Sequence, residues 1–504
     1  MHHVSLIVEF LRGRPAMVFW AVALTQGLLW TLIPVVFYSA PPGEVPVLLA
    51  IGHEFQLGSY LGPPLAFWLG EIAFRLGGMV ALYVLAQACI VTAFWAVFTL
   101  GRSVVGTRHA VLGILLMAGV AVFSVPSPEY GPAVLSAPLW ALALLHYWRA
   151  VGQSQRGAWF LLAFDLGLLL LASYLGLILL VLLIVFTFVT GPGRRALAAP
   201  EPWLGLALLV IVVAPHAAWL VGARDFVMAE FDAAAASAGR LSPLWWLGGA
   251  LVATHLGLGL MVALASGWPR QRRERAPEID RPPVEHFARL YVYFFALMPA
   301  ATVIAIAVTS GRLWTFDSYA ALAPLVLLSG LAVVVAAGDR VLLYRERMVS
   351  SAWLFLLVAP PLMVAVSIGV MPWVFAQDLR VAQPAQAEAE FFADTYQRRT
   401  GKPLAFVSGD ERIAPLIALY APARPRVFFA WAPKRSPWVS VDDVATQGAV
   451  LVWPADNTNV PPATLKTQFP DMVPELPRSF ARTVQGRLPP VRLGWSVLRP
   501  RVVP

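Results

Sequence analysis

Long apolar stretches, each separated from the next by a few polar or charged residues, make up most of the chain as far as residue 377. A helix needs about 20 apolar residues to cross the roughly 30 Å hydrocarbon layer of a bilayer. Residues 157–190 are divided at Ser173-Tyr174, because one helix of about 34 residues would be about 50 Å long. The pattern therefore predicts eleven membrane spans, near residues 15–38, 79–100, 109–125, 131–148, 157–172, 174–190, 203–222, 244–266, 290–309, 320–337 and 352–375.

The pattern changes after residue 377, where short apolar segments alternate with charged and turn-forming residues. Buried strands are predicted at residues 404–408, 427–431 and 449–453, and an apolar helix ending near Tyr420 follows the first of them. This order is typical of a small α/β domain. The sequence thus predicts a transmembrane domain of residues 1–377 and an α/β domain of residues 378–504, which is long enough to bury its own core.

Composition supports a membrane protein. The chain is 59% hydrophobic and only 13% charged, which is too apolar for an ordinary soluble protein. The net charge is +9, but the Lys and Arg residues are spread along the chain and form no dense block. The sequence therefore gives no reason to expect nucleic-acid binding. The one cysteine, Cys89, excludes a disulfide framework, and no acidic cluster has the spacing of a metal site, so we expect neither metal nor cofactor.

The basic residues are distributed unequally between alternate loops. With the N-terminus placed in the cytoplasm, sixteen arginines lie in inside segments and four in outside loops: Arg75, Arg224, Arg240 and Arg312. This asymmetry follows the positive-inside rule and places the C-terminal domain outside. A cleaved signal peptide ending near Ser39-Ala40 is the alternative for the first span, but its apolar stretch is longer than a typical signal-peptide core.

The first outside loop, residues 39–78, is unusually rich in residues that can do chemistry. Glu44, His53, Glu54 and Tyr60 lie between the first two spans, with short surface helices predicted between residues 44 and 56 and from 64 to 77. A carboxylate at the membrane boundary can act as a general base on an acceptor hydroxyl. The alternative is structural: Glu44 caps a helix and Glu54 is simply solvated.

The run from Pro41 to Leu69 resembles the first periplasmic loop of bacterial membrane glycosyltransferases of the protein-mannosyltransferase and aminoarabinose-transferase clan, which have the C-type glycosyltransferase fold. The resemblance extends over nearly the whole chain. It is carried by Pro41-Pro42-Gly43-Glu44, Gly52-His53-Glu54-Phe55-Gln56, Pro63-Pro64-Leu65, Pro138-Leu139-Trp140, Pro215-His216-Ala217-Ala218-Trp219, Val407-Ser408-Gly409-Asp410, Tyr420-Ala421-Pro422 and Ser436-Pro437-Trp438.

This resemblance implies a multi-pass enzyme of the bacterial inner membrane with a periplasmic C-terminal domain. It would transfer a sugar from a polyprenyl-phosphate-linked donor to a lipid, glycan or protein acceptor on the periplasmic side. Glu44 matches the family's loop aspartate, thought to be the catalytic base, and Glu54 matches a conserved glutamate, so both are predicted to be catalytic. His53, Tyr60 and His216 are predicted to bind substrate.

The loop also departs from the family pattern. Val47 replaces a second acidic residue, Ser59 replaces a tyrosine, and Leu61-Gly62 replaces a Lys-His pair whose lysine is placed to meet the carrier phosphate. A departing phosphate needs a cation. Arg312 is the leading candidate because Trp314, Phe316 and Tyr319 surround it, and Arg224 is the second; either arginine could instead meet lipid headgroups or pair with a neighbouring aspartate.

Three ionisable residues interrupt the apolar spans: Asp165, His216 and His255. Such residues are costly in hydrocarbon and often functional, although a neutral histidine bonded to a neighbouring helix can be structural.

Two other functions stay open. A catalytically degenerate family member, acting as a partner in envelope or polysaccharide assembly, would fit the loss of the Lys-His pair. A transporter fits less well, because the span count is odd and no duplicated half is detectable.

Overall fold

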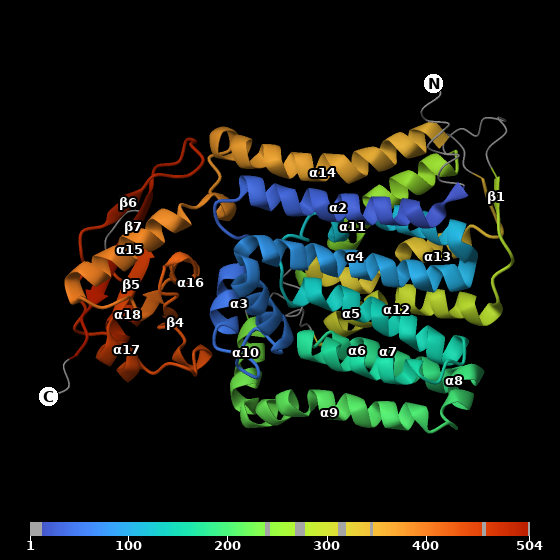
Figure 1. Ribbon diagram of the computed structural model, residues 1–504, viewed down its shortest axis with the longest axis horizontal. Coiled ribbons are helices and arrows are strands. Elements are labelled where there is room, and N and C mark those ends of the chain that lie inside the picture. The colour runs from blue at the N-terminus through green and yellow to red at the C-terminus, as the bar shows by residue number, and fades with distance from the viewer. Residues whose placement is uncertain are drawn as a thin grey trace. The chain divides into compact units, whose positions relative to one another are not determined.

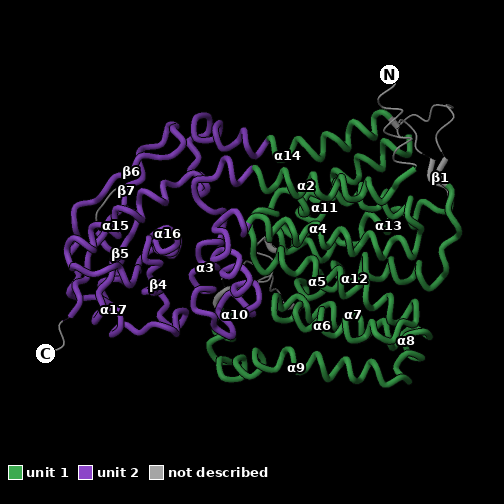
Figure 2. The backbone as a smooth tube through the Cα atoms, in the orientation of Figure 1, with its two compact units in different colours: residues 1–32, 83–362 green, residues 33–82, 363–504 purple. Residues whose placement is uncertain are grey.

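The structure, a computed structural model, describes residues 13–236, 242–267, 278–310, 319–342, 346–455 and 460–501 (Figure 1). The chain divides into two compact units, and each contains segments that are distant in sequence (Figure 2). Unit 1 consists of residues 1–32 and 83–362, and unit 2 consists of residues 33–82 and 363–504. The first loop therefore belongs to the same compact unit as the C-terminal region.

Unit 1 is almost entirely helical. Its elements, including three helices that continue into unit 2, are α2 (Pro15–Phe37), α4 (Leu65–Met117), η1 (Ala121–Phe123), α5 (Pro132–Tyr147), η2 (Trp148–Gly152), α6 (Ala158–Ala172), α7 (Gly176–Val189), α8 (Gly191–Ala196), α9 (Glu201–Gly222), α10 (Arg224–Ala236), α11 (Ser242–Ala265), β1 (Glu278–Asp280), α12 (His286–Ser310), η4 (Tyr319–Val326), α13 (Ser329–Ala336), β2 (Arg340–Leu342) and α14 (Glu346–Val374).

Seven helical stretches among the described residues are long and apolar enough to cross a membrane, and the apolar helices α6 and α7 are shorter. The protein is therefore a polytopic helical membrane protein, as predicted. The count of eleven spans and their orientation stay predictions. Ser173 has an extended backbone between α6 and α7, which confirms that residues 157–190 form two helices.

The 53-residue stretch labelled α4 is not one straight helix. Gly78 and Gly106 both have positive φ angles, 61° and 77°, in the left-handed region that interrupts a right-handed helix. A Cβ added at Gly101 would lie 3.1 Å from the Cβ of Ala110, although nine residues of straight helix would separate them by about 13 Å. The chain therefore folds back at Gly106, between the predicted spans 79–100 and 109–125.

Aromatic rings and polar pairs connect the helices of unit 1. Tyr147 on α5 lies beside Phe186 on α7 and Tyr291 on α12, and the Tyr291 hydroxyl donates a hydrogen bond to the Leu144 carbonyl at 2.6 Å. The imidazole of His146 lies 2.5 Å from the buried carboxyl of Asp165. These contacts give Asp165 a structural partner on the neighbouring helix, and sequence analysis did not single out that histidine.

Unit 2 contains a mixed α/β region, as predicted for the end of the chain. Its elements are α3 (Val45–Gly52), η5 (Arg380–Ala382), α15 (Ala385–Thr400), β3 (Phe406–Gly409), α16 (Ile413–Tyr420), β4 (Arg426–Phe428), η6 (Pro433–Arg435), α17 (Val441–Gln447), β5 (Ala449–Pro454), α18 (Ala463–Gln468), β6 (Arg478–Phe480) and β7 (Val491–Leu498).

Five strands form one sheet in the order β4-β3-β5-β7-β6. Strand β3 pairs in parallel with β4 and β5, placing Val407 opposite Val427 and Val450, while β7 pairs antiparallel with β5 and β6. The three strands predicted from the sequence are the parallel ones. Apart from Arg426 and Pro454, their side chains are buried, as expected of parallel strands covered on both faces.

Helix α3 of the first loop packs against the C-terminal region. Seven of its eight residues are buried, because VPVLLAIG offers an apolar side chain or glycine at every position. Just before α3, Ala40 is buried with Ala385 of α15 and Leu416 of α16. The backbone N–H groups of Ser39 and Ala40 both donate to the Val381 carbonyl, at 2.8 and 3.1 Å. Apolar packing and backbone hydrogen bonds therefore fix the start of the loop without any ion pair.

Glu388 on α15 gives unit 2 a testable pH dependence. Its side chain is only 2% exposed, and burial, with the negative charge of Asp378 adding to it, raises its pKa to about 7. The folded state therefore holds this proton more tightly than the unfolded state, and the stability from that proton is lost as pH rises from about 4.5 to 7.

We expect wild-type protein to lose about 3 kcal/mol of unfolding free energy between pH 5 and pH 8 relative to Glu388→Gln, which has no proton to lose. Unfolding of the detergent-solubilised proteins across this pH range measures the difference. Parallel pH profiles for the two proteins would contradict a buried, protonated Glu388.

Candidate functional site

Glu44 stands at the start of α3, a few residues after the apolar helix α2 ends at Phe37. It occupies the capping position, but its side chain makes no capping hydrogen bond to the helix. The carboxylate is instead 61% exposed, and Arg380 Nη1 donates to its Oε1 at 3.3 Å. The helix-capping alternative for Glu44 is therefore wrong, and the acid is available to solvent beside a cation.

A pocket of about 200 Å³ opens next to Glu44 within unit 2. Besides Glu44, its lining includes the polar side chains of Asp378, Arg380, Gln383 and Arg412. Asp378 is already paired with Arg482 at 2.6 Å. Among the described residues, the exposed Arg412 guanidinium has no ion-pair partner, and the Arg412 backbone is fixed because Asp410 accepts its N–H at 2.9 Å. The pocket is therefore lined by two carboxylates, each paired with an arginine, and by Arg380 and Arg412.

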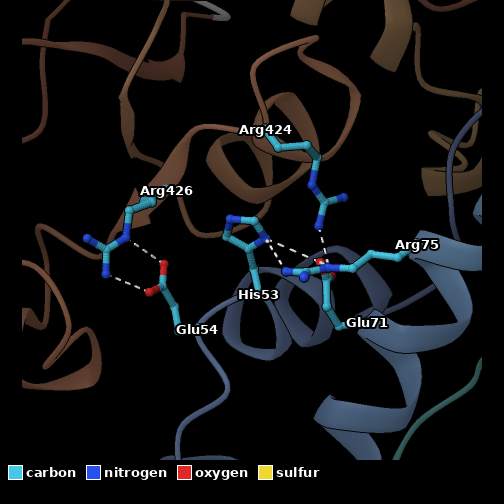
Figure 3. A network of polar contacts seen from close by, with 6 residues as sticks. All are labelled: His53, Glu54, Glu71, Arg75, Arg424 and Arg426. Atoms are coloured by element: carbon cyan, nitrogen blue, oxygen red, sulfur yellow. Dashed lines mark hydrogen bonds and ion pairs between the residues drawn. The ribbon is translucent and has the colours of Figure 1, made fainter.

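Glu54 lies just beyond the other end of α3 and is fully engaged. Arg426 at the start of β4 donates two hydrogen bonds to the Glu54 carboxylate, from Nε to Oε1 at 2.8 Å and from Nη2 to Oε2 at 2.6 Å (Figure 3). Only 8% of the Glu54 side chain is exposed, so the expectation of a solvated Glu54 is wrong. The hydrogen-bonded carboxylate raises the pKa of Arg426, so the arginine stays charged and the pair persists across physiological pH.

A second buried carboxylate, Glu71 in the first turns of α4, is the centre of a larger network (Figure 3). It is 1% exposed and has three partners. Arg75 donates to Oε1 at 2.8 Å, Arg424 donates to Oε2 at 2.9 Å, and His53 Nδ1 lies 3.2 Å from Oε1. A buried carboxylate must be paired to remain charged, and these contacts provide that pairing.

Aromatic contacts reinforce these ion pairs. The guanidinium of Arg424 lies 4.5 Å from the centre of the Phe74 ring, and that of Arg435 lies 4.4 Å from the Tyr60 ring. Tyr60 also meets Phe429, which follows β4, edge to face at 6.0 Å. Residues of the C-terminal region thus contact the first loop through both charge and ring faces.

The other predicted site residues lie in unit 1 or outside the described residues. His216 is buried, and its Nε2 lies 3.3 Å from the Tyr174 hydroxyl. Arg224 is the exposed first residue of α10. His255 binds the Leu251 carbonyl and the Ser329 hydroxyl, a helix-to-helix connection. Arg312 lies outside the described residues.

The arginines that surround the first loop were not predicted. Arg380, Arg412, Arg424 and Arg426 all come from the C-terminal region, whereas the cations predicted from the sequence lie in short outside loops. One signal was present in the sequence: Arg424-Pro425-Arg426 immediately precedes a buried strand. Arginines that border a buried strand favour acidic partners nearby, and here Glu71 and Glu54 of the first loop are those partners.

No group of three or more His, Cys, Asp or Glu side chains within the described ranges could hold a metal ion.

Comparisons with known proteins agree with the fold. The chain resembles two crystal structures of ArnT from Cupriavidus metallidurans. For the apo state the TM-score is 0.60 and the sequence identity 14%. For the structure bound to undecaprenyl phosphate the TM-score is 0.59 and the sequence identity 15%. Each alignment covers 97% of this chain and at least 99% of the other. The sequence model of the family described as dolichyl-phosphate-mannose-protein mannosyltransferase matches residues 62–219.

The fold is that of a GT-C membrane glycosyltransferase. The family resemblance predicted from the first loop is confirmed at the level of this clan. No curated protein matches the sequence. The family match begins after Glu44 and Glu54 and therefore does not include these two residues.

Removing Arg424 should destabilise unit 2, because Glu71 would keep its burial but lose one of its cations. We expect Arg424→Ala to lower the unfolding free energy by about 3 kcal/mol. Arg501→Ala is the matched control, since Arg501 pairs at 2.8 Å with Asp471 on the surface, and it should cost less than about 1 kcal/mol. Equal losses in the two variants would show that Glu71 does not depend on Arg424.

Proposed function

We propose that the protein transfers a sugar from a polyprenyl-phosphate-linked donor to an acceptor hydroxyl on the periplasmic side of the bacterial inner membrane. The observation that carries this proposal is an exposed carboxylate, Glu44, sharing a pocket with two arginines in a chain with a glycosyltransferase fold. The related ArnT structure with bound undecaprenyl phosphate supports the choice of donor class. The acceptor belongs to one of three classes: lipid, glycan or protein.

The proposal includes the topology predicted from the sequence: eleven spans, a cytoplasmic N-terminus and a periplasmic C-terminal domain of residues 378–504. Glu44 follows α2, and Arg380 follows α14, each by only a few residues. If α2 and α14 are spans, both side chains belong near the membrane surface, where the phosphate of a lipid carrier would also lie.

In the proposed reaction Glu44 accepts the proton of the acceptor hydroxyl as its oxygen attacks the anomeric carbon of the donor sugar. The bond between that carbon and the phosphate oxygen breaks, and polyprenyl phosphate leaves with the bonding electrons. Arg380 and Arg412 stabilise the phosphate charge, the role that the family gives to a lysine. Arg312 and Arg224 remain further candidates for that contact, and His53, Tyr60 and His216 for contacts to substrate.

A specific observation favours the second candidate, a non-catalytic family member acting as an assembly partner. The family's Lys-His position is occupied by Leu61 and Gly62, and here the chain makes a tight turn in which Ser59 and Gly62 exchange backbone hydrogen bonds. This turn supplies no cation. The two candidates differ in whether Arg380 and Arg412 replace the missing lysine.

Glu44→Gln should abolish sugar transfer, with a loss of at least about 100-fold, because the amide cannot accept the acceptor proton. Stability should change by less than about 1 kcal/mol, since the Glu44 pair with Arg380 is exposed. Transfer of labelled sugar by purified protein measures the loss. Glu390→Gln, an exposed glutamate on α15 that does not line the pocket, is the control; full transfer by Glu44→Gln would leave the reaction without its proposed base.

Arg412→Ala should weaken binding of polyprenyl phosphate, without any sugar, by about 10- to 100-fold, as expected for the loss of charge-assisted hydrogen bonds to phosphate. Equilibrium binding to purified protein in detergent tests this, with Arg501→Ala as the control. Unchanged affinity in Arg412→Ala would remove this arginine from the donor site. If wild-type protein binds no polyprenyl phosphate, the assembly-partner function becomes the better one.

A further inference from the structure

We infer that Arg424 and Arg426 form a clamp that positions α3 and the proposed base Glu44, and that Glu54 is a positioning residue rather than a catalytic one. This inference rests on the proposed function for its reaction but on separate contacts for its geometry. The clamp is defined as the ion pairs of Arg426 with Glu54 and of Arg424 with Glu71. In both pairs the acid comes from the first loop and the arginine from the C-terminal region.

The two ends of α3 are held by different means. Before its first turn, Ser39 and Ala40 are tied to Val381 by backbone hydrogen bonds. After its last turn, Glu54 is held by Arg426 through two parallel hydrogen bonds, an arrangement that fixes orientation as well as distance. A helix fixed at both ends holds its first residues in one direction, and Glu44 immediately precedes those residues.

Glu54 itself is poorly suited to act as the base. Both of its carboxylate oxygens accept hydrogen bonds from Arg426, and its side chain is almost completely buried. A base must have a lone pair that reaches the acceptor proton, and both oxygens of Glu54 are directed at the guanidinium of Arg426 instead. Glu44 meets the requirement, because it is exposed and lines the pocket.

Arg424 adds a second constraint on the same loop. Its backbone has a φ of 48°, a conformation that costs free energy in a residue other than glycine and that persists only when the surroundings hold it. Pro425 fixes the backbone between the two arginines, so the two guanidinium groups leave the chain from a rigid segment. His53, which lies within α3's C-terminal cap, is bound to the same Glu71 that Arg424 contacts.

The experiment compares Arg426→Ala, Glu54→Arg and the charge exchange Glu54→Arg/Arg426→Glu in purified full-length protein. Sugar transfer gives kcat and the donor KM, and hydrogen–deuterium exchange gives the protection of residues 45–52. A positioning role predicts that Arg426→Ala lowers kcat about 10- to 100-fold with a smaller change in donor KM, and speeds exchange in α3. The charge exchange should recover much of both losses, because the pair is restored with its polarity reversed.

Arg399→Ala is the control, since Arg399 pairs with Glu475 and lies over the Trp495 ring, both in the C-terminal region. Lost transfer in the charge exchange, with normal protection of α3, would make Glu54 itself catalytic and overturn the inference. Unchanged kcat and unchanged exchange in Arg426→Ala would also overturn it. If wild-type protein transfers no sugar, the proposed function fails, while the exchange measurement still decides whether the clamp holds α3.

Discussion

The buried carboxylate of Glu71 constrains much of unit 2. A carboxylate with 1% exposure is stable in its charged form only when cations surround it, and here the cations come from two places in the sequence. Arg75 lies one helical turn away on α4, whereas Arg424 lies in the C-terminal region. Satisfying this one charge therefore brings together residues that are more than three hundred positions apart.

The consequences reach Glu44 through α3. The same short segment that supplies Arg424 also supplies Arg426, which binds Glu54 at the end of that helix. Apolar burial of α3 and the backbone hydrogen bonds to Val381 complete the attachment. Glu44, which pairs with Arg380, is exposed in the pocket that Arg380 and Arg412 also line. The acids of the first loop therefore differ in role: Glu54 and Glu71 are buried in ion pairs that hold the loop, and Glu44 is exposed in the pocket.

Hydrophobic periodicity predicted the elements well, because burial in lipid or in a sheet core leaves a strong local signal. The parallel strands β3, β4 and β5 and the division between α6 and α7 could all be predicted in this way. The reversal inside α4 was also predicted, as the boundary between the spans 79–100 and 109–125. In the structure the chain turns at Gly106, which adopts a left-handed backbone.

The partners of charged residues could not be predicted from the same signal. Nothing local in the sequence connects Glu54 to Arg426 or Asp165 to His146, since an ion pair depends on which elements the fold brings together. Glu54 was predicted to be catalytic, with a solvated side chain as the alternative, and neither prediction included an ion pair with Arg426. A cation in place of the missing lysine was predicted in the short outside loops, whereas the described cations beside Glu44 come from the C-terminal region.

A double-mutant cycle between Glu71 and Arg424 tests the central claim most directly. The unfolding free energies of wild type, Glu71→Gln, Arg424→Gln and the double variant would be measured in detergent. If this pair ties the first loop to the C-terminal region, the two substitutions should be non-additive by about 1 to 3 kcal/mol, because either one alone leaves a buried charge without its partner. Additive effects within about 0.5 kcal/mol would contradict the account.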